Sequence, residues 1–180
     1  MIIVIPIEIK IREFIPKLFL TYQILKKTNS KVLFAGQRFI STKIKEFKNV
    51  IYLDKCTHYS RLLENPYNLS ENIVCMLDEE GPVSFFDNDT LHIHYNKKID
   101  KIINHFFFWG KKDLLKIKKK EFLKNKSFIL GHPKYDLLNK RYIKIFDSQI
   151  NKIKKKYNKF VFFAASFDSD PDLNLQTLKS

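Results

Sequence analysis

The chain has 180 residues, of which 44% are hydrophobic, and a formal net charge of +14. This length and apolar content allow one sizeable core, or one domain and the beginning of another, and they exclude an intrinsically disordered chain. With only 4 Gly and 6 Pro, collagen-like sequence and long flexible linkers are also excluded. The positive charge attracts anions in general, and it does not choose among nucleic acid, anionic lipid and phosphorylated substrates.

The first half of the chain alternates short apolar runs with helical periodicity. Residues 2–9 predict a buried strand, and residues 11–27 predict a helix with Phe14, Leu18 and Ile24 at helical spacing. Further strands are expected at 31–35, 50–53 and 72–77, and further helices at 38–47 and 57–69. This rhythm, at spacings of about twenty residues, favours an α/β fold with a Rossmann-like parallel sheet flanked by helices.

The second half continues the same rhythm after an ambiguous stretch at 83–95. Strands are expected at 105–108, 127–130 and 159–165, and helices at 98–104, at 111–124 and within 135–157. We therefore predict a Rossmann-like amino-terminal domain over residues 1–138, crossover helices over 139–158, and the first strand of a truncated second domain over 159–180.

The compartment is predicted from the cysteines and the N-terminus. Cys56 and Cys75 have no CxxC spacing and are expected to be buried thiols in a reducing compartment. Lys10 and Arg12 interrupt the N-terminal apolar run, which is too short to span a bilayer, and no small-residue cleavage site follows it. We expect a cytoplasmic protein, with basic helices that can hold it at the inner membrane face.

The strand at 73–77 ends in three adjacent carboxylates and a glycine, Asp78 to Gly81. Ligands of open α/β sheets gather outside the carboxyl ends of the strands, and Gly81 permits a sharp turn there. Adjacent carboxylates repel one another, which raises at least one pKa and can create a general acid or base near neutral pH. We expect Glu79 or Glu80 to be catalytic, with Asp78 as the supporting charge. The alternative is a helix N-cap or a solvated turn.

Two further strands end in a glycine turn, at Trp109-Gly110 and at Gly131-His132-Pro133. Trp109 has two possible roles. It either packs in the core or the cleft wall, or it provides an aromatic surface on which a sugar stacks. His132 can donate, accept or carry charge near pH 7, so it is a candidate ligand group. Gly131 and Pro133 set the backbone geometry, and Asp136 is expected to cap a helix that begins at Leu137.

Neither a metal site nor a cofactor site is predicted. His92 and His94 are two residues apart but lack a nearby third ligand. The sequence contains neither G-x-G-x-x-G nor G-x-x-x-x-G-K-[ST], so dinucleotide and P-loop phosphate binding are not supported. Arg12 and Glu13 follow the first strand directly and are expected at the cleft edge, where an ion pair between them is the simplest expectation.

The three strand-end motifs, L-D-E-E-G, F-x-W-G and G-H-P-K-Y-D-L-L, occur in that order. Together they resemble the amino-terminal half of a family of bacterial surface carbohydrate biosynthesis proteins, which has a DEEG motif, a WG motif and a G-N-P-R-F-D-like motif. The opening P-x-E-x-K-x-R-E, from Pro6 to Glu13, is also similar to the start of that family. Among the positions that differ, His132 replaces Asn and Lys134 replaces Arg, and lysine cannot make the two-pronged contact of arginine.

This resemblance implies a GT-B-like glycosyltransferase with two Rossmann-like domains facing a cleft. The chain would be its acceptor-side domain, inactive alone, because the nucleotide-sugar donor binds mostly to the missing second domain. The acceptor would be an oligosaccharide or a lipid-linked sugar. Peripheral association with an anionic membrane is expected, and binding of nucleic acid is not expected. The substrate-binding residues expected at the cleft are Arg12, Glu13, Gly81, Trp109, Gly110, Gly131, His132, Lys134 and Asp136.

Two alternatives remain open. The first is a fragment of a UDP-N-acetylglucosamine 2-epimerase, whose H-x-E-A-G motif is similar to residues 78–81, with Glu79 at the acidic position. The second is a non-catalytic basic module that binds nucleic acid or anionic lipid. The lysines are scattered over several predicted helices without a base-stacking motif, which disfavours nucleic acid.

Overall fold

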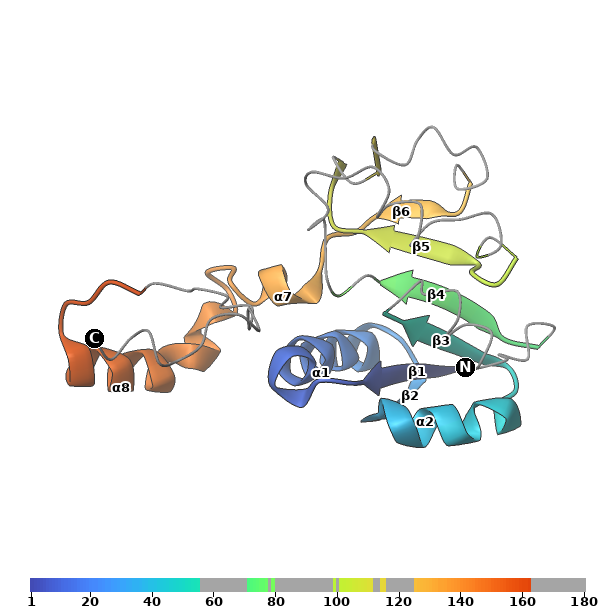
Figure 1. Cartoon of the computed structure of the whole chain (residues 1–180), viewed down its shortest axis with the longest axis horizontal. Coiled ribbons are helices and arrows are strands. Elements are labelled where there is room, and N and C mark those ends of the chain that lie inside the picture. The colour runs from blue at the N-terminus through green and yellow to red at the C-terminus, as the bar shows by residue number, and fades with distance from the viewer. Residues whose placement is uncertain are drawn as a thin grey trace, which may run out of the picture. The chain divides into compact units, whose positions relative to one another are not determined.

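The computed structural model describes residues 1–55, 71–77, 79, 99, 101–111, 114–115 and 125–162 (Figure 1). The chain divides into two compact units, Met1–Tyr142 and Ile143–Ser180. The predicted helix at 57–69, the ambiguous stretch with His92 and His94, and Cys56 lie outside the described residues, as does most of the predicted helix at 111–124.

The first unit contains a six-stranded sheet in the order β2-β1-β3-β4-β5-β6, with every pair of neighbours parallel. Figure 1 shows the arrows of β1 and β3 to β6 pointing the same way. The strands are β1 (Ile2–Ile7), β2 (Lys31–Gly36), β3 (Val50–Asp54), β4 (Ile73–Leu77), β5 (His105–Phe108) and β6 (Ser127–Ile129). The predicted α/β, Rossmann-like parallel sheet is confirmed.

The first two helices of this unit, α1 (Lys10–Lys27) and α2 (Gln37–Lys43), begin within one residue of the predicted positions. The described residues also form the 3-10 turn η1 (Ile44–Glu46) and the helix α7 (Pro133–Asp136). On α1, the polar residues Glu13, Lys17 and Thr21, at i, i+4 and i+8, are buried while Leu18 is 43% exposed. The apolar periodicity therefore predicted the packing of Ile24 but not this buried polar stripe.

Alternation along the strands divides the core into two clusters. The first contains Val4, Tyr52, Val74, Met76 and Phe106 from the strands, together with Ile40, Ile99 and Ile103 from the connections. The second contains Ile5, Leu53, Cys75 and Leu77, and Leu20 and Ile24 of α1 pack against it. Neighbouring side chains of a strand point to opposite faces, so α1 covers one face of the sheet and α2 covers the other.

The second unit begins with η3 (Ile143–Phe146), and α8 (Asp147–Tyr157) follows it. No side chain of either element is buried. Residues 160–162, where the sequence predicts the beginning of a strand, are in neither a strand nor a helix, and residues 163–180 lie outside the described part of the chain. Across the described residues, no helix has both the length and the apolar character needed to span a bilayer.

Candidate functional site

Three strand-end turns converge at the carboxyl edge of the sheet. Glu79 follows β4, Trp109 follows β5, and His132 follows β6. The Nε2 atom of His132 lies 3.2 Å from Oε2 of Glu79, and the ring centroids of His132 and Trp109 are 4.5 Å apart. The side chains of Glu79 and His132 are 5% and 1% exposed. A carboxylate, an imidazole and an indole therefore form one cluster, which we call the edge cluster.

Glu13 joins the start of α1 to this edge. Its side chain is fully buried, and its Oε2 accepts hydrogen bonds from the backbone N–H of Glu8 at 2.9 Å and from Nζ of Lys17 at 2.9 Å. Its other oxygen, Oε1, lies 3.3 Å from Nζ of Lys55, the residue that follows β3. A buried carboxylate is tolerated only when it is paired and hydrogen-bonded, and Glu13 is both.

Lys17 connects Glu13 to Glu79. Its ammonium donates to the carbonyl oxygen of Pro6 at 2.7 Å and to Oε2 of Glu13 at 2.9 Å, and it lies 3.3 Å from Oε1 of Glu79. An ammonium has three protons to donate, so the three contacts account for all of them. Lys17 therefore positions Glu79 and has no donor left for a ligand.

The protonation of His132 follows from its own contacts. Its Nδ1 accepts a hydrogen bond from the backbone N–H of Lys134 at 3.1 Å, which caps α7. A nitrogen that accepts carries no proton, so the proton of the neutral ring is on Nε2, the atom that faces Glu79. The 3.2 Å contact with Glu79 lacks the alignment of a hydrogen bond, and Nε2 has no other partner among the described residues. His132 therefore presents a donor that is not committed.

The ionisation of Glu79 differs from the sequence-based expectation of a raised pKa. Burial raises its pKa, but the contact with His132 and the positive charge of Lys17 outweigh burial and lower the pKa from its ordinary 4.5. Repulsion within the acidic run therefore does not make Glu79 a general acid near neutral pH. It is an ionised carboxylate that accepts hydrogen bonds. Asp78, Glu80 and Gly81 lie outside the described residues.

An ion-pair network adjoins the edge cluster. Among the described residues, the carboxylates of Glu8, Glu13 and Glu79 are paired with the cations of Arg12, Lys17 and Lys55. Three carboxylates and three cations are therefore matched within this network. Such an arrangement has no excess positive charge for a phosphate, and it suits neutral groups that both donate and accept hydrogen bonds.

The other predicted residues divide into those that join this site and those that do not. Arg12 lies 3.9 Å from Glu13 and is partly exposed, so the expected ion pair is long. Gly131 has φ +79, which explains why glycine precedes His132. The side chain of Lys134 is exposed, and only its backbone contacts His132.

The predicted role of Asp136 as a helix cap is wrong. Helix α7 begins at Pro133 with His132 as its N-cap, and Asp136 is its last residue. The sequence suggested a later start because Leu137 and Leu138 look like the first apolar residues of a helix. Proline at the first helical position, directly after His132, was the signal that marks the true start.

Two residues of the site were not predicted, Lys17 and Lys55. Lys17 stands four residues after Glu13 on one helix, the spacing at which opposite charges meet. Lys55 directly follows a parallel strand, as Glu79 and His132 do. Both signals are present in the sequence, but isolated lysines are hard to distinguish in a chain with 33 Lys and Arg.

A metal centre is not indicated by the described residues, which contain no group of three or more His, Cys, Asp or Glu side chains able to hold an ion. Comparisons of the chain with protein-family models, with curated proteins and with solved structures find no match. The function is therefore argued from the edge cluster and its geometry.

Proposed function

We propose that this chain is the acceptor-side domain of a glycosyltransferase-like protein of surface polysaccharide biosynthesis, and that it does not transfer sugar by itself. The observation that carries the proposal is the pairing of Glu79 with His132 at the carboxyl edge of the sheet. The carboxylate of Glu79 accepts, the Nε2–H of His132 donates, and the two atoms are 3.2 Å apart. A sugar hydroxyl both donates and accepts, so one hydroxyl beside this pair can contact both groups.

The neighbouring indole supports a sugar as the ligand. The ring of Trp109 lies 4.5 Å from that of His132 and 5.2 Å from that of Tyr135. Aromatic rings offer flat apolar surface next to polar groups, which is the combination that a pyranose ring with its hydroxyls requires. The matched charges of the ion-pair network beside the edge cluster favour a neutral acceptor over the phosphates of a nucleotide-sugar donor.

In this proposal, Glu79 orients and polarises the acceptor hydroxyl and does not remove its proton outright, because a carboxylate with a lowered pKa is a weak base. The Nε2–H of His132 donates to the same hydroxyl oxygen. Lys17, which is itself held by Glu13, keeps Glu79 in place and ionised. The nucleotide-sugar donor, with the sugar to be transferred, would bind to a second domain or to a second polypeptide.

The test is binding of the purified chain to an array of bacterial surface glycans, with the strongest hit titrated by calorimetry. Glu79→Gln keeps the shape but removes the charge, and we expect it to weaken binding by roughly 10- to 100-fold, as for hydrogen bonds to a charged group. Glu71→Gln is the matched control, since Glu71 is partly exposed and paired only with Lys48 among the described residues. Equal affinity of the two variants, or turnover of a nucleotide sugar by the chain alone, would defeat the proposal.

A second contact, with an anionic membrane, is supported by α8. Lys154, Lys155 and Lys156 form its last turn, and Ile153 and Tyr157 are 45% and 52% exposed. Basic residues next to exposed apolar side chains are typical of helices that lie at a membrane surface. We expect co-sedimentation with phosphatidylglycerol vesicles that weakens steeply with salt and is lost when the three lysines become glutamines. Equal binding to neutral vesicles would contradict this contact.

A further inference from the structure

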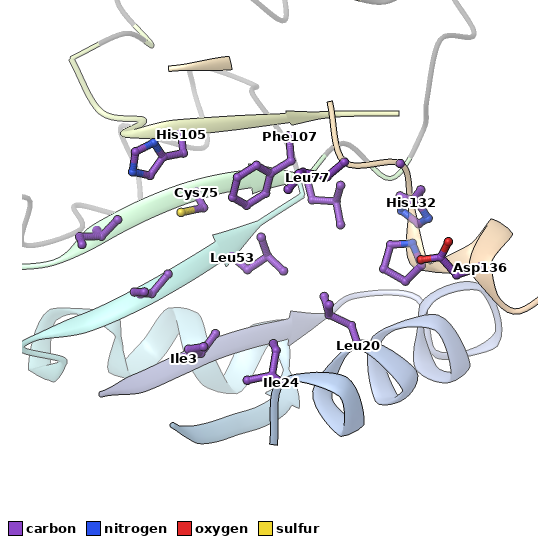
Figure 2. Close-up of a pocket in the computed structure, with 15 residues that line it drawn as sticks. Ile3, Leu20, Ile24, Leu53, Cys75, Leu77, His105, Phe107, His132 and Asp136 are labelled. Carbon is purple, nitrogen blue, oxygen red and sulfur yellow. The ribbon is translucent and has the colours of Figure 1, made fainter. Parts of the chain in front are cut away.

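A cavity of about 440 Å³ lies on the face of the sheet that α1 partly covers (Figure 2). Its walls include Leu53, Cys75, Leu77 and Phe107 from the strands and Leu20 and Ile24 from α1. Figure 2 shows His105 at one end of the cavity and His132, with Asp136, at the other. Cavities of about 300–1,000 Å³ with mostly apolar walls and few polar groups are typical of small-molecule sites.

The strand order explains why this cavity exists. The chain moves in one direction from β1 to β2 and in the opposite direction from β2 through β6. Right-handed crossovers therefore place α1 on one face and the later connections on the other. Ile40, Ile103 and Leu114, described residues of three later connections, all pack on the opposite cluster. Beyond the strands, the described residues that line the cavity belong to α1 and to residues 130–136.

The cavity is long, is lined mostly by apolar side chains and has an imidazole at each end. Ile73, Cys75 and Leu77 line it along β4, and four residue steps in a strand cover about 13 Å. Nδ1 of His105 and Nε2 of His132 are buried and have no hydrogen-bond partner among the described residues. A ligand that fills this space therefore needs a hydrocarbon body and an oxygen at the His132 end, where the Nε2–H is available as a donor.

We propose that this cavity binds a single hydrocarbon chain, with an oxygen-bearing headgroup at His132 and Glu79. A length of about 13 Å corresponds to an extended chain of about ten to twelve carbons. Because His132 belongs to both the cavity and the edge cluster, a sugar bound at Glu79 and a hydrocarbon chain in the cavity can be parts of one molecule. Only the identity of the headgroup rests on the proposed function. Under that function, the molecule is a lipid-linked acceptor.

The binding test uses two uncharged probes, 1-decanol below its solubility limit and decyl β-glucoside below its micelle concentration. Trp109 is the only tryptophan of the chain and packs against His132, so its emission should change saturably as either probe binds. Cys75 lines the cavity, so in a Cys56→Ser background either probe should slow its alkylation by N-ethylmaleimide. Absence of saturable binding would overturn the proposal.

Variants that fill the cavity locate the site. Leu130 and Ile73 line the cavity and are 64% and 42% exposed, so Leu130→Phe and Ile73→Phe should fold. We expect each to weaken 1-decanol binding roughly tenfold, which corresponds to about 1.4 kcal/mol. Leu18→Phe on α1 is the matched control, because Leu18 is 43% exposed and does not line the cavity. Equal affinities for all three variants would place the probe elsewhere and overturn the proposal.

The same measurements separate this inference from the proposed function. If 1-decanol binds in the cavity and Glu79→Gln leaves the affinity for decyl glucoside unchanged, the cavity site stands and the sugar site fails. If glycans bind through Glu79 and 1-decanol does not bind, the sugar site stands and the cavity site is overturned. Concentration-dependent dimerisation that protects Cys75 without any probe would show that a second copy covers this face, and it would also overturn the cavity site.

Discussion

The Nε2 atom of His132 lies 3.2 Å from Oε2 of Glu79, although Glu79 follows β4 and His132 follows β6. The contact exists because β4, β5 and β6 are parallel neighbours, so their carboxyl ends meet at one edge of the sheet. Trp109, at the end of β5, lies against the same imidazole. The protonation of Glu79 is thereby coupled to the residue that caps α7.

This coupling predicts a stability that depends on pH. The pKa of Glu79 is lowered from 4.5 in the folded chain, so below about 4.5 the unfolded chain takes up this proton before the folded chain does. The free energy of unfolding therefore falls as pH decreases through the folded pKa. Urea titrations between about pH 5 and pH 3 should show a shallower decline for Glu79→Gln than for the wild type and for the control Glu71→Gln. Parallel curves for all three chains would contradict the lowered pKa.

Removal of Lys17 should be strongly destabilising. Lys17→Met leaves the carboxylates of Glu13 and Glu79 buried without their shared cation, and breaking a buried pair in this way costs about 3–5 kcal/mol. Lys43→Met is the matched control, because Lys43 and Glu46 form an exposed pair, which contributes less than about 1 kcal/mol. Urea-unfolding midpoints measure both. A similar loss for the two variants would show that the buried position of Lys17 is unimportant.

The cap formed by His132 can be separated from its contact with Glu79. His132→Ala loses the bond from Lys134 N–H to Nδ1, and removal of an N-cap costs about 1 kcal/mol. His132→Asn should retain the cap, because asparagine is a preferred N-cap residue, but it removes the imidazole. Hydrogen exchange at the Lys134 amide should be slow in the wild type and His132→Asn and fast in His132→Ala. Fast exchange in both variants would show that asparagine does not replace histidine as the N-cap of α7.

The turn before His132 should require glycine. Gly131 has φ +79, and a Cβ there would meet no atom within 4 Å, so Gly131→Ala tests backbone strain alone. We expect a loss of about 1–2 kcal/mol. Gly36→Ala is the control with equal space and no positive φ, and it should be neutral or stabilising by up to about 1 kcal/mol. Thermal unfolding compares the two, and equal effects would mean that the positive φ carries no cost.

The sheet was predictable because strand-forming information is local. Each strand is a short apolar run, and β4, the run IVCML, is buried from Val74 to Leu77, as expected for a strand covered on both faces. The spacing of helices between strands required parallel pairing. The face of α1 was harder to predict, because its buried stripe of Glu13, Lys17 and Thr21 is polar and resembles a solvent-exposed surface in the sequence.

The sequence by itself determined that this chain forms a parallel α/β sheet with Glu79, Trp109 and His132 at strand ends, since alternation, apolar runs and glycine turns are properties of neighbouring residues. Only the tertiary structure decided the ionisation of Glu79, the role of Lys17 and Lys55, and the cavity beside α1. Each of these depends on groups from different strands and helices meeting in a buried environment. Burial and charge act through distance in space, and a sequence does not contain that distance.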